Sequence, residues 1–128
     1  VQHLAGHESP AYGSGPPELH PLRLAADSRL GAIVGSGDGG DGAFTVNTYH
    51  HQGVRLEDLA PGLRATGVSP WAQPGSPTGA PSQLVEALES VDPERFVVAV
   101  QCHPERIEST PPAFARLFGA FVEAARAP

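Results

Sequence analysis

The sequence predicts an α/β protein built on an open sheet, and two segments near its C-terminus carry that prediction. Residues 96–100 read Phe-Val-Val-Ala-Val, a continuously apolar run that is typical of a buried central strand. Residues 112–126 form the second segment, because apolar side chains recur there with the spacing of one helical face, at Phe114, Leu117, Phe118, Phe121 and Val122. A buried strand followed by an amphipathic helix closes an open α/β sheet, whose ligands bind beyond the carboxyl ends of strands. The turn after residue 100 is therefore the first place to look for a functional site.

The first half of the chain predicts short elements separated by loops. Residues 1–21 mix Gly, Pro, His and Ser without periodicity, which indicates a surface loop, and residues 22–24 follow as a short strand. Segment 28–34 fits either a helical turn or a strand, whereas the Gly- and Asp-rich run 35–42 favours a turn, which we interpret as a variable hairpin tip. Residues 44–47, Phe-Thr-Val-Asn, favour a strand.

The second half continues the pattern without a domain boundary. Residues 59–63, Leu-Ala-Pro-Gly-Leu, mark a tight connection into a strand at residues 64–68. Residues 69–82 contain four Pro and two Gly with little apolar content, which predicts a loop inserted within one domain. Residues 84–89 alternate apolar and acidic side chains with only partial regularity. We therefore expect residues 1–128 to belong to a single domain.

Composition excludes several classes of partner. The 128 residues carry a formal charge of -6, and Arg is the only basic residue type besides His, so no basic stripe is available to neutralise phosphates. We expect neither nucleic acid nor a membrane as a partner. A single Cys cannot form an internal disulfide, and the longest apolar run is too short for a bilayer span or a secretion signal, so the default location is cytoplasmic. The first residues carry neither a helix cap nor a turn signal, from which we expect the sequence to begin within a domain.

A candidate catalytic pair lies in the turn Gln101-Cys102-His103-Pro104-Glu105. A His and a carboxylate two positions later can lie together at one edge of the sheet. The carboxylate can then orient the imidazole. Three residues alone more often describe a solvated turn without a catalytic role. Segments elsewhere in the chain decide between these interpretations.

Several segments, taken in order, resemble the class I glutamine amidotransferases, and most closely their gamma-glutamyl-hydrolysing branch, peptidase family C26. Residues 100–105 are similar to the V-Q-W-H-P-E signature, residues 47–52 to a V-N-S-x-H-H-Q block, residues 59–63 to an L-A-P-G-L turn, and residues 84–89 to a G-L-V-E-A-I-E strand. Residues 20–24 and Gln2-His3-Leu4 resemble two further blocks, which extends the resemblance nearly from end to end. It implies a flavodoxin-like open α/β sheet with mixed strands, of which this chain is the C-terminal part.

The resemblance also implies a Cys-His-Glu triad that acts on a small-molecule gamma-glutamyl substrate. A Cys thiolate attacks the gamma-amide, His103 transfers the proton, Glu105 fixes the imidazole tautomer, and water then hydrolyses the acyl-enzyme. In the family the nucleophile stands in a G-x-C-x-G elbow before the Gln-Asp-Leu block, and this sequence begins at that block. We therefore expect the nucleophilic Cys on a segment or chain outside these residues, and the 128-residue chain alone to be inactive.

Cys102, the single thiol, is a poor candidate for the nucleophile. Adjacent residues of an extended segment point to opposite faces, so Cys102 and His103 are not expected to share a hydrogen bond. Cys102 stands where the family has Trp, and we interpret it as a buried packing thiol. The loss of that aromatic ring beside His103 weakens the expected rigidity of the turn.

The resemblance places His51 and Gln52 in a loop that contacts the glutamyl substrate, whereas the alternative is a polar run that caps a strand. Adjacent His residues are also a weak metal cue, as are His3 and His7 at i, i+4 spacing. No third ligand at a fixed spacing supports a metal site, and we expect neither a metal nor a cofactor.

The Gly-rich run 35–40 satisfies G-x-G-x-x-G literally without predicting a nucleotide site. Asp41-Gly42 follow directly and disfavour the helix that such a site needs. Asp38 and Asp41 also lack the acidic ligand count of a calcium loop.

Three functions stay open at this point. The first is a gamma-glutamyl amide hydrolase, which the His50-His51-Gln52 block favours. The second is a glutamine amidotransferase domain that supplies ammonia to a synthase, which a synthase domain in the same gene would favour. The third is a truncated, non-catalytic remnant that binds a partner, and that partner could supply the elbow.

Overall fold

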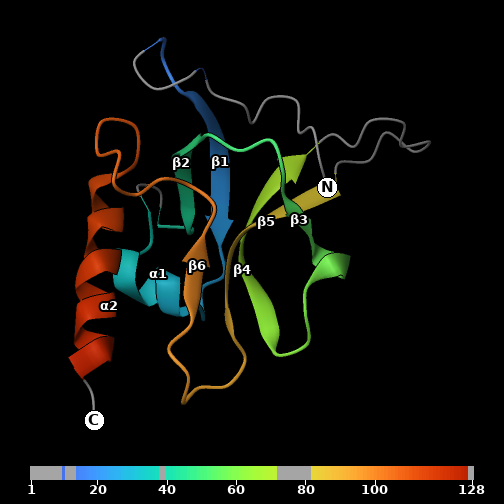
Figure 1. Ribbon diagram of the computed structural model, residues 1–128, viewed down its shortest axis with the longest axis vertical. Helices are drawn as coiled ribbons and strands as arrows, with labels where there is room; N and C mark the ends of the chain where they lie inside the picture. Colours follow the sequence, from blue (N-terminus) through green and yellow to red (C-terminus); the bar gives the residue numbers. More distant parts are fainter. Residues whose placement is uncertain (1–9, 11–13, 38–39, 72–81, 127–128) are drawn as a thin grey trace.

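The computed structural model describes residues 10, 14–37, 40–71 and 82–126. A six-stranded sheet has the strand order β2-β1-β4-β5-β3, and β6 also pairs with β5 (Figure 1). The elements, in chain order, are β1 (Glu18–Leu24), α1 (Arg29–Val34), β2 (Ala43–Thr48), β3 (Val54–Arg55), the 3-10 helix η1 (Leu56–Asp58), β4 (Leu63–Trp71), β5 (Ser82–Ser90), β6 (Val98–Val100), the 3-10 helix η2 (Pro112–Ala115) and α2 (Arg116–Arg126).

The fold is a flavodoxin-like α/β sheet with helices, which confirms the predicted class. Among the described residues, every pair of named strands is antiparallel, so the expected mixture of strand directions is not present there. β2, β4 and β6 consequently run in the same direction, and β2 and β6 both end at one edge of the sheet. This shared edge brings the residues after β2 close to the turn after β6.

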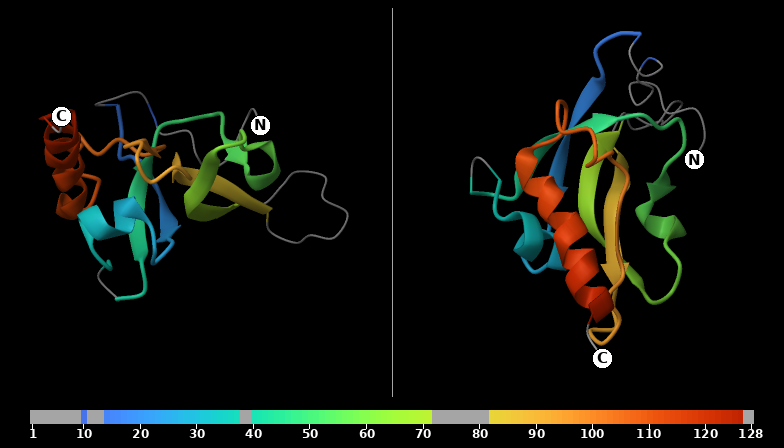
Figure 2. Two further views of the ribbon diagram at one scale, coloured as in Figure 1. Left: turned by 90° about the horizontal axis from the view of Figure 1, so that it is seen from below. Right: turned by 60° about the vertical axis from the view of Figure 1, so that its left-hand side comes forward.

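Both helices pack against one face of the sheet, as the two views of Figure 2 show. Their buried side chains meet those of β1 and β2 in a single apolar cluster, formed by Leu22, Leu24, Leu30, Val34, Phe44, Val46, Ala87, Val98, Cys102, Phe114 and Leu117. Phe44 and Phe114 pack edge to face with ring centroids 5.3 Å apart. Burial of this apolar area is the main contribution that holds α1 and α2 on the sheet.

Segment 28–34, which the sequence left open, is a helix. Ser28 caps its N-terminus, because the Ser28 hydroxyl accepts a hydrogen bond of 2.9 Å from the backbone N–H of Gly31. The run 35–42 then connects α1 to β2, so its interpretation as a hairpin tip is wrong. Within the described residues of that run, Gly35, Gly37, Gly40 and Gly42 have positive φ angles, which explains the glycine content of the connection.

The predicted loop 69–82 is shorter than expected at its N-terminal end. β4 continues through Trp71, which pairs with Ser82 at the start of β5. Trp71 and Leu84 bury each other in a small second cluster, and this burial explains why a Pro-containing segment remains a strand. The central residues 72–81 lie outside the described part of the chain.

Two further predictions gain definite boundaries. The strand predicted at residues 96–100 is limited to Val98–Val100. It pairs with β5 as an outer strand, so within the described residues it is not central. The helix predicted over 112–126 is confirmed, with the 3-10 turn η2 leading into α2. The predicted strands at 22–24, 44–47 and 64–68 lie within β1, β2 and β4.

No helix of the described residues has the length and apolarity needed to cross a membrane.

Candidate functional site

His103 and Glu105 form a hydrogen-bonded pair in the turn that follows β6. Nδ1 of His103 lies 2.7 Å from Oε1 of Glu105. An ionised carboxylate only accepts hydrogen bonds, so Nδ1 carries the proton and Nε2 keeps its lone pair. The hydrogen bond from His103 lowers the pKa of Glu105 below its ordinary value, which keeps the carboxylate ionised. The pair has the geometry of a base and the group that orients it.

Asn47, at the end of β2, fixes the backbone of His103. The backbone N–H of His103 donates to Oδ1 of Asn47 at 2.8 Å, and Nδ2 of Asn47 donates to the carbonyl of His103 at 3.0 Å. Nδ2 also lies 2.7 Å from the hydroxyl of Thr110, which itself donates to the His103 carbonyl. Asn47 is fully buried, so these bonds are shielded from water. Sequence reasoning assigned no such role to Asn47, although the residue belongs to the block 47–52.

An aromatic ring also packs on the candidate base, although Cys102 replaces the family's Trp. Tyr49 and His103 lie edge to face with ring centroids 5.4 Å apart. The guanidinium of Arg106 also lies over the Tyr49 ring, with its central carbon 4.2 Å from the ring centroid. Tyr49 therefore provides part of the rigidity that the Trp-to-Cys change was expected to remove.

Cys102 lies in the apolar core, as expected from the alternation of neighbouring side chains. It is 6% exposed, whereas the side chain of the adjacent His103 is 40% exposed. Burial, reinforced by the charge of Glu86, raises the pKa of the Cys102 thiol to about 12. A thiol in this setting forms almost no thiolate at neutral pH and does not suit a nucleophile.

His51 and Gln52, the predicted substrate contacts, lie on the loop between β2 and β3, and both are exposed. The backbone carbonyl of Gln52 is held by His50 Nδ1 at 2.8 Å and by Gln101 Nε2 at 3.4 Å. The loop is thereby tied to the exit of β6, two residues before His103. This places both residues on the edge of the sheet that carries the His103–Glu105 pair.

A second cluster at this edge consists of His20, His50 and Glu86. Nε2 of His20 lies 3.6 Å, and Nε2 of His50 3.8 Å, from Oε2 of Glu86. Burial lowers the pKa of both imidazoles and raises that of Glu86 to about 8. Sequence reasoning missed this group because its members come from three separate elements, and only the adjacent His50-His51 pair gave a weak signal.

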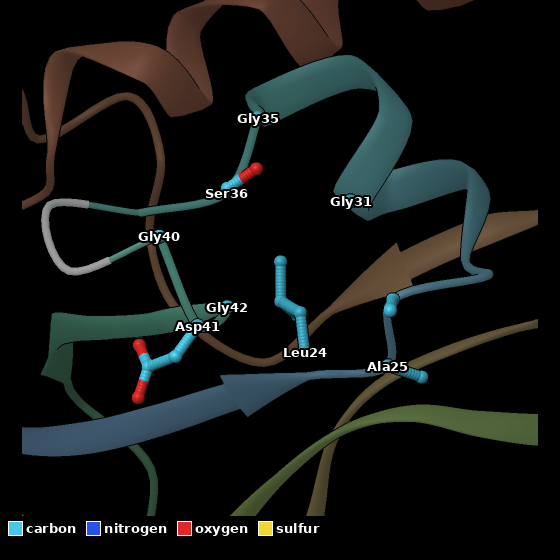
Figure 3. A pocket seen from close by; sticks show the side chains of 9 residues that line it. Leu24, Ala25, Gly31, Gly35, Ser36, Gly40, Asp41 and Gly42 are labelled. Carbon is cyan, nitrogen blue, oxygen red and sulfur yellow. The ribbon is translucent and has the colours of Figure 1, made fainter.

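A cavity of about 200 Å³ lies at the opposite edge of the sheet, between the end of β1 and the α1-to-β2 connection (Figure 3). Its lining is mainly Gly and Ala, and Figure 3 shows the side chain of Leu24 directed toward α1. The Gly-rich run 35–40 leads into β2, so no helix opens where a nucleotide site would need one. His3 and His7 lie outside the described residues.

Three comparisons with known proteins agree with this geometry. Residues 2–105 match the Peptidase C26 family. Protein NtpR of Enterococcus hirae is 39% identical over 80 residues, which are 62% of this chain and 28% of NtpR. The glutaminase domain of Trypanosoma brucei CTPS, solved with bound acivicin, is similar with a TM-score of 0.58 and 29% identity over 84% of this chain and 38% of that chain. The chain therefore spans well under half the length of either relative.

Proposed function

Because this chain belongs to the Peptidase C26 family, we propose that it carries the acid-base part of an enzyme that hydrolyses gamma-glutamyl amides. The observation that supports this most directly is the 2.7 Å hydrogen bond between His103 and Glu105. It leaves Nε2 of His103 with a lone pair on a side chain that is 40% exposed, and so able to reach a reacting group.

In the proposed reaction the nucleophile is a Cys outside these 128 residues, on a preceding segment or on a second chain. Its thiol passes a proton to Nε2 of His103, and the resulting thiolate attacks the gamma-carbonyl carbon. The imidazolium then gives that proton to the leaving amine, whose bond to the carbonyl carbon breaks, and a thioester remains. Water then attacks the thioester while His103 accepts its proton, which releases glutamate and regenerates the thiolate. Glu105 stabilises the imidazolium in both steps. The burial and raised pKa of Cys102 argue against that thiol in this role.

The substrate proposed is a small gamma-glutamyl amide whose glutamyl end contacts His51 and Gln52. Both are exposed on a loop that is tied to the turn of His103 through the Gln52 carbonyl. A reducing location such as the cytoplasm fits this chemistry, because the nucleophile must remain a thiol.

A glutamine amidotransferase domain that supplies ammonia to a synthase is the second candidate. The similarity to the CTPS glutaminase domain favours it. The two candidates differ in substrate. A hydrolase cleaves gamma-glutamyl amides of larger amines without a partner, whereas an amidotransferase prefers glutamine and is stimulated by its synthase. A non-catalytic remnant would do neither.

The test uses a form of the protein that contains this sequence together with the segment proposed to carry the nucleophile. Glutamate release from glutamine and from gamma-glutamyl amines is measured for the parent and for three variants. His103→Ala is expected to lower kcat by roughly 10²–10⁴-fold, and Glu105→Gln by less, because a neutral partner still orients the ring. Cys102→Ala is expected to retain most of the activity.

Cys102→Ala and His103→Ala form a matched pair, because the two residues are adjacent in sequence but Cys102 is buried and His103 is partly exposed. Loss of acyl-enzyme formation in Cys102→Ala, with activity retained in His103→Ala, would overturn the assigned roles. Turnover by the 128-residue chain alone would overturn the proposal that the nucleophile lies outside it.

A further inference from the structure

His20, His50 and Glu86 come from parts of the chain that are distant in sequence, yet their polar atoms converge. His20 lies near the start of β1, His50 just beyond β2 and Glu86 in the middle of β5. One ligand atom from each side chain lies within 4.8 Å of the other two. All three side chains are at most 10% exposed.

The hydrogen bonds of the two imidazoles orient their lone pairs toward the carboxylate. Nδ1 of His20 faces the carbonyl of Pro21 at 3.1 Å, and Nδ1 of His50 faces the carbonyl of Gln52 at 2.8 Å. A carbonyl can only accept, so both Nδ1 atoms carry the proton and each neutral ring has its lone pair on Nε2. Histidines that bind metal ions characteristically donate their second ring N–H to a carbonyl or carboxylate in this way.

The distances suit a shared cation better than direct hydrogen bonds. The two nitrogen-to-oxygen distances of 3.6 and 3.8 Å exceed those of a hydrogen bond. Ligands at about 2.0–2.1 Å from a tetrahedral Zn²⁺ lie roughly 3.3 Å from each other, so the two nitrogen-to-oxygen distances would contract by a few tenths of an ångström. The ligand atoms of His20 and His50 lie within 4.8 Å of each other, so their separation would contract by at most about 1.5 Å.

We propose that His20, His50 and Glu86 bind one divalent transition metal ion, with Zn²⁺ the best match, through the two Nε2 atoms and a carboxylate oxygen. Two imidazoles and one carboxylate form a donor set that Zn²⁺ favours, whereas Mg²⁺ and Ca²⁺ prefer ligands that are all oxygen. The fourth position of a tetrahedral ion is left for water or for another ligand.

The ion would join parts of the sheet that hydrogen bonds connect weakly. β1 and β5 are separated by β4 in the strand order, and β1 pairs with β4 over only two residues, Arg23 and Leu24 (Figure 1). The ion would also hold the start of the β2-to-β3 loop, in which Tyr49 packs on His103. Its role is structural, and it does not depend on the proposed hydrolysis.

The experiment measures the binding of Zn²⁺ and Co²⁺ to metal-free protein, with three ligand variants and one control. Titration calorimetry is expected to give one Zn²⁺ per chain, and Co²⁺ to give the intense visible bands of a four-coordinate ion. His20→Gln, His50→Gln and Glu86→Gln should each weaken Zn²⁺ binding by at least about a hundredfold. The control is His51→Gln, which changes the exposed neighbour of His50 and should leave the affinity for Zn²⁺ unchanged.

Glu86→Gln preserves shape, and near-ultraviolet circular dichroism checks that each variant is folded. Zn²⁺ is further expected to raise the Tm of the parent and of His51→Gln but not that of Glu86→Gln. Absence of stoichiometric Zn²⁺ binding by the parent would overturn the proposal and indicate that protons occupy the cluster. An equal loss of affinity in His51→Gln would overturn it as well, because the ion would then bind the exposed loop. The parent Co²⁺ spectrum decides the matter if a ligand variant does not fold.

Discussion

At the scale of single residues, Asn47 holds the backbone of the candidate site in place. Its amide satisfies both the N–H and the carbonyl of His103, and it does so from a different strand. A catalytic imidazole has to be held in place by its own backbone before a carboxylate can orient the ring. Asn47 provides the first constraint and Glu105 the second.

Asn47→Ala is expected to destabilise the protein by about 2–3 kcal/mol, because it leaves buried polar groups of the His103 turn without their partner. Urea denaturation measures the change in the free energy of unfolding. Thr45→Ala is the matched control, since Thr45 is exposed on the same strand and should change stability by less than about 0.5 kcal/mol. Equal effects of the two substitutions would show that Asn47 has no special role.

Cys102 permits a prediction about pH. Burial raises the thiol pKa to about 12 from an ordinary value of 9.0, so at pH 8 the folded protein should react with iodoacetamide roughly a thousandfold more slowly than the urea-unfolded protein. Because the folded pKa lies above the unfolded one, the neutral thiol favours the folded state below pH 9, and this contribution is lost as the pH rises toward 12. Rapid alkylation of folded protein at pH 8 would show that the thiol is accessible.

At the scale of secondary-structure elements, the close packing of β4 between β1 and β5 depends on Gly67. A Cβ atom on Gly67 would lie 2.8 Å from the Ala87 Cβ and 2.8 and 2.9 Å from methyl carbons of Leu22 and Leu24. The register of β4 against β5 also shifts on both sides of Gly67, which indicates a β-bulge. The absent side chain therefore lets β4 approach Leu22, Leu24 and Ala87 closely at this point.

Gly67→Ala and Gly119→Ala should therefore have opposite effects on stability. Gly67→Ala forces core side chains or strands apart and should cost about 1–3 kcal/mol. Gly119 lies in α2 with open space around its Cβ position, so Gly119→Ala should stabilise the protein by about 0.5–1 kcal/mol through helix propensity. Thermal denaturation of both variants checks the signs, and stabilisation by Gly67→Ala would contradict the close packing.

At the scale of the whole molecule, apolar surface is left at one side of the sheet. Phe118 and Val122 are each 50% exposed and lie one helical turn apart on α2. The edge of β6 that faces away from β5 pairs with no strand among the described residues. Such a helix face and such a strand edge both favour association with another chain.

The 128-residue chain is therefore expected to associate with itself as its concentration increases. Light scattering coupled to size-exclusion chromatography measures this association. Phe118→Ser should reduce it, whereas Ile107→Ser should not, because Ile107 is exposed in the segment between β6 and η2 and is not part of α2. Elution as a monomer at all concentrations, with a cooperative thermal transition, would contradict the prediction.

The sequence alone determined the features that arise from neighbouring residues. The periodicity of residues 112–126 specified α2, the β-favouring run 44–47 specified β2, and alternation separated the buried Cys102 from His103. The His103–Glu105 pair was singled out by its two-residue separation together with the resemblance of other segments to a known family, because the separation alone also fits a solvated turn. Segment 28–34 fitted either a helical turn or a strand, and only the structure shows that Arg29–Val34 form a helix capped by Ser28.

Contacts between residues that are distant in sequence depend on the packing of the sheet. Asn47 and His103 are 56 positions apart, and no local pattern indicates that the amide of one fits the backbone of the other. The convergence of His20, His50 and Glu86, and the extension of β4 to Trp71, likewise depend on strand order and register. Propensity and periodicity describe neighbouring residues, so they predict helices and strands. A buried polar residue needs a hydrogen-bond partner, but the sequence does not show which residue that partner is. The packing of the sheet determines which partner it finds.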